Sequence, residues 1–279
     1  MDYRSIIVCL DDGENARQRM ELALGLAIRH DAHLTGLHLS YMPSAAFVAS
    51  DGAEQLYASL QRDLAQRQSA ACDVFLAAAR ARNVPADFIA ARNLDLSAAT
   101  AYARVSDLVI AGQPDPVDTA AYLGEGFASR FLLDVGRPVL LTPHGLPARV
   151  DFDHVMVAWN GSRESSRALF DALPFLQAAR RVTLLSVHRE GSSWPEGGPV
   201  PAPDLQALLR RHGIDVRLVE HVGRDDPGRW LLARATDIED PADLLVAGAY
   251  GHNRLSELVL GGVTRTLLEQ MPLPLLLSH

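Results

Sequence analysis

The residues best suited to chemistry gather in a glycine-rich stretch of the second half of the chain. The stretch starts at Gly248, ends with the pair Gly261 and Gly262, and leads into Thr264 at the start of a predicted helix. Glycines let backbone N–H groups approach an anion closely, a helix N-terminus adds about half a positive charge, and Thr264 offers a hydroxyl. The residues that accompany them are Tyr250, Gly251, His252, Val263 and Arg265. This combination predicts a phosphate-binding site.

A second loop follows a short apolar run in the same half. Its residues are Trp159, Asn160, Gly161, Ser162, Arg163 and Glu164. Gly161 permits a sharp turn, and Ser162 is suited to cap the helix that follows. Ligands of open parallel sheets bind beyond the carboxyl ends of the strands, where the strand order switches. We therefore expect the two loops to lie near one pocket.

Composition excludes several classes of function. All 26 basic residues of the 279-residue chain are arginine, which rules out a P-loop, a protein kinase and a pyridoxal-phosphate enzyme, because each needs a lysine. A net charge of −8 argues against nucleic acid and anionic membranes as partners. The two cysteines, Cys9 and Cys72, fit a reducing compartment, and the first residues lack the layout of a signal peptide. We expect a cytoplasmic protein.

Patterns typical of catalysis or of metal binding are missing. Gly161 and Ser162 lack the G-x-S-x-G frame of a nucleophile elbow, so Ser162 is better explained as a helix cap. His30, His33 and His38 are close in sequence, but strand alternation and a turn separate them, and no H-E-x-x-H pattern exists. We therefore predict no catalytic residue and no dedicated metal site.

The chain repeats itself once. Three pairs of segments match, namely 6–11 with 155–160, 107–112 with 243–248, and 138–141 with 274–277. The stretch from Pro143 to Val150 is rich in proline and glycine and is the natural linker. We predict two domains, 1–143 and 150–279.

Short apolar runs alternate with helical patterns in both copies, which is typical of a parallel α/β sheet. Strands are expected near 5–11, 33–40, 86–91, 107–112 and 138–142, and near 153–160, 181–188, 215–221, 243–248 and 274–278. A long helix is expected near 54–82, and a flexible loop at 191–203. The last strand of each copy is apolar throughout and would be an aggregation site at an open sheet edge. We therefore expect these two strands to pair with each other across a pseudo-two-fold axis.

The spacing Gly248-x2-Gly251-x9-Gly261-x-Val263-Thr264 resembles the nucleotide-binding signature of the universal stress protein family. That signature reads Gly-x2-Gly-x9-Gly-Ser/Thr, followed by Val and Ser/Thr. The resemblance covers the whole chain as two tandem family domains. It implies an α/β fold with two Rossmann-like, five-stranded parallel sheets of order 3-2-1-4-5, packed as an intrachain pseudo-dimer through strand five.

The resemblance also implies a ligand, ATP, usually with a divalent cation such as Mg or Mn. The backbone of Ala158 and Val187 would frame the adenine. Two positions depart from the family pattern: Asn160 replaces an acidic residue after strand one, and Gly262 replaces a phosphate-binding Ser or Thr.

The first copy departs further. It keeps Asp11 and Gly112, but Asp115 and Glu125 stand where the second copy has Gly251 and Gly261. Ala128 stands where the second copy has Thr264. Carboxylates that face a phosphate pocket weaken binding. The ligand is therefore expected mainly in the second copy.

The function implied is that of a stress-response protein that binds or senses ATP and signals to an unidentified protein partner by changing conformation. An interaction module that acts through its pseudo-dimer surface without nucleotide is one alternative, and a slow ATP hydrolase is another. The two-domain chain could assemble further into a homo-oligomer.

Overall fold

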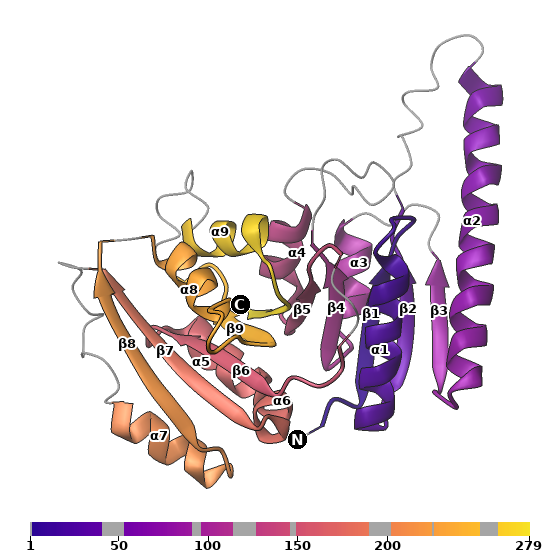
Figure 1. Ribbon diagram of the computed structural model, residues 1–279. Coiled ribbons are helices and arrows are strands. Elements are labelled where there is room, and N and C mark those ends of the chain that lie inside the picture. The colour runs from indigo at the N-terminus through magenta and orange to yellow at the C-terminus, as the bar shows by residue number, and fades with distance from the viewer. Residues whose placement is uncertain are drawn as a thin grey trace. The chain divides into compact units, whose positions relative to one another are not determined.

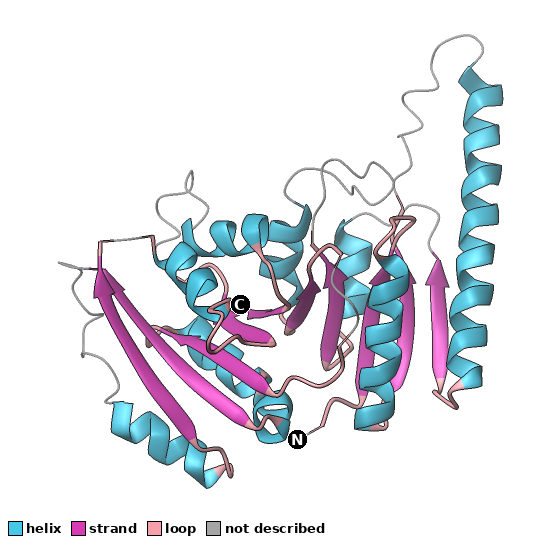
Figure 2. Ribbon diagram, viewed as in Figure 1, coloured by secondary structure: helices cyan, strands magenta, loops and turns pink. Residues whose placement is uncertain are grey.

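The computed structural model describes residues 2–40, 53–90, 96–113, 127–145, 149–189, 202–224, 226–251 and 262–279. The chain divides into two compact units: one is Tyr3–Phe131, and the other is Leu132–His279 with the first two residues. Strands and helices alternate along the chain in both units (Figure 2). The α/β class expected from the sequence is confirmed.

The first unit is built on four parallel strands in the order β3-β2-β1-β4. Its elements are β1 (Ser5–Leu10), α1 (Ala16–His30), β2 (His33–His38), α2 (Ala53–Ala81), β3 (Ala86–Ala90), α3 (Leu96–Ala103) and β4 (Leu108–Gly112), followed by α4 (Phe127–Val135), which continues into the second unit. The helix expected near 54–82 is α2, which lies alongside β2 and β3 (Figure 1). In β1, Ile6 is opposite Leu34 on one side and Leu108 on the other, and all three are fully buried.

The second unit contains the strand order β8-β7-β6-β9-β10, which is the order 3-2-1-4-5 expected for the second copy. Its elements are β5 (Val139–Thr142), β6 (His154–Trp159), α5 (Arg163–Asp171), α6 (Leu173–Ala178), β7 (Arg181–Arg189), α7 (Ala202–Arg211), β8 (Val216–Gly223), α8 (Pro227–Ala235), β9 (Leu244–Gly248), α9 (Gly262–Gln270) and β10 (Leu275–Ser278). The five strands are parallel to one another. The predicted loop 191–203 lies outside the described residues except for its last two, which begin α7.

The last strands of the two copies pair with each other. β10 runs antiparallel to β5, with Leu276 opposite Leu140 and Leu277 opposite Val139. These four side chains are fully buried. The pairing that the sequence predicts from edge chemistry is therefore confirmed.

Two helices lie where one apolar stripe runs through the sequence. The apolar stripe that includes Leu169 and Leu176 predicts a single helix, but α5 ends at Asp171 and α6 begins at Leu173. Pro174 stands in the first turn of α6 and has no N–H to donate to the preceding turn. Proline is tolerated at the start of a helix and disrupts a helix interior, so the stripe divides at this point.

No helix among the described residues is long and apolar enough to span a membrane.

Candidate functional site

The loop after β6 is organised by its own side chains. The carboxamide oxygen of Asn160 accepts a hydrogen bond from the Ser162 N–H at 3.1 Å, and Gly161 between them has a φ of 72°. Ser162 Oγ in turn accepts from the Ser165 N–H at 3.1 Å and caps α5. The predicted roles of Gly161 as a turn residue and of Ser162 as a helix cap both fit this geometry.

Gly248, the last residue of β9, lies against the backbone of α5. A Cβ atom at this position would stand 2.5 Å from both the carbonyl carbon of Glu164 and the nitrogen of Ser165. No real Cβ tolerates such distances, so only glycine fits here. Strand-to-helix packing alone accounts for this glycine.

Gly251 brings the two loops together. A Cβ at Gly251 would lie 2.6 Å from Oε2 of Glu164 and 3.3 Å from Oγ of Ser162. The glycine-rich stretch and the loop after β6 therefore meet at Gly251. The contact also gives Glu164 a place at the site that the sequence does not predict, because its carboxylate lies directly beside the glycine-rich stretch.

Glu164 keeps its negative charge at this place. Burial, the largest single influence, raises the pKa of its carboxyl group, since the residue is only 9% exposed. The N–H of its own backbone, the Arg163 guanidinium at 3.0 Å and the charge of His279 outweigh burial, so the pKa lies below its ordinary value. A glutamate in the first turn of a helix is common for reasons of helix stability. Sequence alone therefore gives no signal that this carboxylate faces a loop.

Thr264 joins the two ends of the glycine-rich stretch. Its Oγ1 accepts a hydrogen bond from the N–H of Tyr250 at 3.1 Å, and the threonine is 4% exposed. Tyr250 has a φ of 56°, which side-chain-bearing residues adopt only rarely. Residues 250 and 264 are thus held together although thirteen residues separate them. The structure does not describe the intervening residues 252–261, which include the predicted site residues His252 and Gly261.

The remaining residues of α9 differ in their surroundings. Arg265 pairs with Glu269 one turn further along, at 2.7 Å, and the exposed pair raises the pKa of the guanidinium. Arg265 therefore forms its ion pair within its own helix. Gly262 is exposed and a Cβ there would meet nothing within 4 Å, while Val263 is half-buried.

The strand residues expected to frame an adenine lie at the carboxyl edge of the sheet. Ala158 and Trp159 end β6 and stand opposite Leu185 and Ser186 of β7. Val187 follows on β7, and all three predicted residues are half-buried.

The acidic residues expected to weaken the first copy, Asp115 and Glu125, lie outside the described residues. Within the described ranges no group of three His, Cys, Asp or Glu residues forms a metal-binding cluster. Burial raises the pKa of the Cys9 thiol to about 12, so this residue stays protonated, as its position in an apolar strand predicts.

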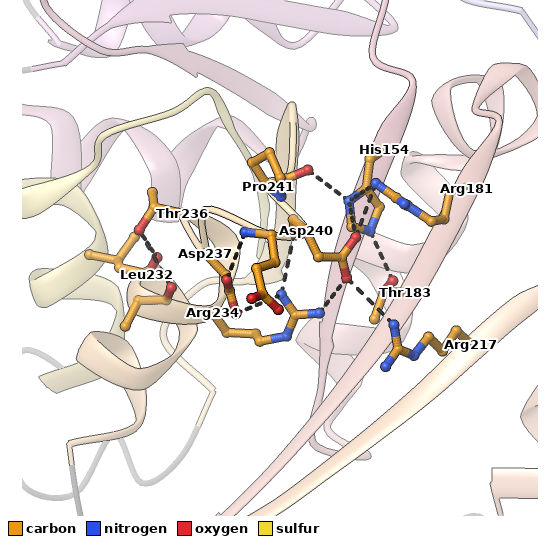
Figure 3. A network of polar contacts seen from close by, with 12 residues as sticks. His154, Arg181, Thr183, Arg217, Leu232, Arg234, Thr236, Asp237, Asp240 and Pro241 are labelled. Carbon is orange, nitrogen blue, oxygen red and sulfur yellow. Dashed lines mark hydrogen bonds and ion pairs between the residues drawn. The ribbon is translucent and has the colours of Figure 1, made fainter.

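A second polar cluster lies at the amino ends of β6 and β7, away from the loops just described (Figure 3). Asp240 contacts three arginines: Arg234 at 2.5 Å, Arg181 at 3.0 Å and Arg217 at 3.6 Å. The hydrogen bond from Arg234, the largest influence, holds the pKa of Asp240 below its ordinary value. His154 completes the cluster, with its Nδ1 3.6 Å from Oδ1 of Asp240, and we assign the whole arrangement to stability.

Comparisons with known proteins agree with this architecture. The model of the Universal stress protein family matches residues 151–279. A universal stress protein from Archaeoglobus fulgidus aligns with 98% of this chain and 95% of its own, at 16% identity and a TM-score of 0.69. A functionally unknown protein from Pseudomonas aeruginosa aligns with 99% of this chain and 92% of its own, at 16% identity and a TM-score of 0.58.

A third structure, a universal stress protein in complex with cAMP, covers 46% of this chain and 98% of its own, at 21% identity and a TM-score of 0.33. At such identities the first two structures establish the fold and nothing further. No curated protein matches the chain in sequence.

Proposed function

Because residues 151–279 are a domain of the universal stress protein family, we propose that this half of the chain binds an adenine nucleotide, ATP in the first instance. The site comprises the loop 159–162 and the stretch from Gly248 to Arg265. The hydrogen bond from the Tyr250 N–H to Thr264 Oγ1 carries the proposal. It holds both ends of the glycine-rich stretch at the carboxyl edge of the sheet, where ligands of this fold class bind.

A divalent cation fits the charge of this site. The Glu164 carboxylate beside Gly251 would repel a bare phosphate chain, and Mg²⁺ prefers carboxylate and phosphate oxygens as ligands. Glu164 and Asn160 are the side chains that would hold such an ion, which would supply charge neutralisation between protein and phosphates. Ala158 and Val187 frame the base in this proposal.

The output of binding is conformational in this proposal. The nucleotide orders the stretch from Gly248 to Thr264 and changes the surface that a partner protein meets. In this proposal the repeat divides the chain into two domains, 1–143 and 150–279, and the second domain carries the ligand.

Two observations favour a second candidate, an interaction module that works without nucleotide. Gly248 is explained by strand-to-helix packing, and Glu164 adds negative charge where phosphates would lie. Binding measurements separate the two candidates.

The first test identifies small molecules released when protein purified without added nucleotide is denatured. We expect about one adenine nucleotide per chain by chromatography and mass spectrometry. Calorimetry with Mg-ATP, ADP, AMP and cAMP then gives the affinity of each. An empty protein that also binds none of these at millimolar concentration would favour the interaction module.

Thr264→Val is the variant that tests the site. It keeps the shape of the side chain but removes the acceptor of the Tyr250 N–H, so we expect nucleotide affinity to fall by about tenfold or more. Thr266→Val on the same helix is the control, since Thr266 lies against Gly228 of α8. Equal affinities for the two variants would place the ligand elsewhere.

A further inference from the structure

The first unit holds a buried arginine where the second unit has an alanine. Arg19 belongs to the first turns of α1, and only 3% of the residue is exposed. Its Nε donates to the carbonyl oxygen of Cys9 at 2.6 Å, and its Nη2 donates to Oδ2 of Asp11 at 2.5 Å. Both partners belong to the end of β1 and the residue just beyond it.

The same guanidinium also reaches the end of β4. A Cβ on Gly112 would lie 2.1 Å from Nη1 of Arg19, so the absence of a side chain at Gly112 makes room for the guanidinium. Arg19 therefore lies between the carboxyl ends of β1 and β4. These two strands are where the strand order of the unit switches, the position at which open α/β sheets bind ligands.

The second unit is built differently at the matching place. The repeat aligns Cys9 with Ala158, Asp11 with Asn160 and Gly112 with Gly248, and it places Ala168 opposite Arg19. Ala168 is fully buried. In the second unit the amide of Asn160 thus replaces the carboxylate of Asp11, and the methyl group of Ala168 replaces the guanidinium side chain of Arg19.

A buried guanidinium needs a matched set of acceptors. Removing a buried charge from water is costly unless a counter-charge and hydrogen bonds compensate it. The Asp11 carboxylate, with 14% of its side chain exposed, and the Cys9 carbonyl supply that set. Asp11 is itself fixed, because its Oδ1 accepts from the Gly13 N–H at 3.0 Å.

We propose that the switch point of the first unit is a binding site for a guanidinium-type organic cation, and that Arg19 occupies it as a ligand built into the chain. The site is therefore closed to nucleotides, and the chain binds no more than one per molecule. This last point rests on the proposed function of the second half, whereas the cation site does not.

Replacing Arg19 by the residue of the second copy tests the proposal. Arg19→Ala leaves Asp11 without its cation, so we expect the melting temperature to fall by roughly 5–15 °C. Millimolar methylguanidinium chloride should then raise the melting temperature of this variant above its value in sodium chloride of equal concentration. N-methylurea, which has a similar shape and no charge, should have no such effect.

Arg17→Ala on the exposed side of α1 is the matched control, and neither it nor the wild type should respond to methylguanidinium. A variant Arg19→Ala that ignores methylguanidinium, or a wild type that responds equally, would overturn the proposal. If Arg19→Ala does not fold, Arg19→Met decides. The methionine side chain fills much of the same space without charge, so we expect this variant to be less stable than the wild type. A variant as stable as the wild type would show that Arg19 contributes only packing and no charge interaction. None of these measurements uses a nucleotide, so failure of the nucleotide proposal is seen separately.

Discussion

The His154 ring is buried and bonded at both nitrogens. Its Nδ1 lies 2.8 Å from the carbonyl oxygen of Pro241, and its Nε2 lies 2.9 Å from Oγ1 of Thr183. The Arg181 guanidinium, which can only donate, lies 3.1 Å from the same Nδ1. Burial and the nearby charges of Arg181 and Arg234 favour the neutral form of the ring (Figure 3).

This environment makes the protein less stable in acid. Burial is the largest of several influences on the His154 ring and, with both arginines, lowers its pKa below the ordinary 6.5. The unfolded chain then binds a proton that the folded chain refuses, so stability falls as pH drops below about 6.5 and levels off below the folded-state pKa. Denaturant unfolding from pH 8 to pH 5 measures the loss. His154→Asn should remove this part of the pH dependence, and an unchanged pH profile in that variant would contradict the assignment.

At the scale of elements, the fit between β9 and α5 depends on a missing side chain. Gly248 touches the α5 backbone, whereas Gly262 opens α9 with free space around its Cα. The two glycines belong to one sequence signature but obey different constraints. The first is required by packing, and the second has no steric reason to be glycine.

Alanine substitutions should separate the two positions. Gly248→Ala forces β9 away from α5, so we expect a loss of about 3 kcal/mol or more in the free energy of unfolding. Gly262→Ala should be neutral or stabilising by about 0.4–1 kcal/mol, because alanine restricts the unfolded chain and favours the helix. Urea denaturation of both variants measures the difference. Similar losses in both would show that the contact at Gly248 can relax.

The sequence predicts the elements well and their side-chain contacts poorly. Alternating apolar runs, the internal repeat and the apolar last strands are enough for the strands themselves and for the pairing of β5 with β10. The strand order of the second copy follows only from the family resemblance. Pro174 indicates a helix break, since proline removes a donor. The apolar stripe continues across Pro174, however, and by itself predicts one unbroken helix. The contacts of Glu164 and Arg19 could not be predicted from the sequence. Their roles depend on how far a long side chain reaches across the fold, and residue spacing carries no information about that.

At the scale of the whole molecule, the pairing of β5 with β10 joins residues 139–142 to residues 275–278. The two strands lie at opposite ends of the second unit's sequence. Closing a long loop costs conformational entropy before any contact repays it, so such contacts tend to form late in folding. β6 and β7, by contrast, are close neighbours in the chain.

Leu276→Ala and Leu184→Ala should therefore act on different rate constants. Both side chains are buried, and each truncation should cost about 2–5 kcal/mol. Leu276 faces Leu140 across the long-range pair, so its loss should speed unfolding and leave refolding nearly unchanged. Leu184 belongs to β7 beside β6, so its loss should slow refolding. Stopped-flow chevron plots distinguish these results, and equal slowing of refolding in both variants would contradict the expected order.

If β5 and β10 join last, their contacts are absent from the transition state and belong wholly to the barrier against unfolding. The buried leucines of the β5–β10 pair then set the unfolding rate, and so the lifetime of the folded molecule. The folding rate depends on contacts in other parts of the structure.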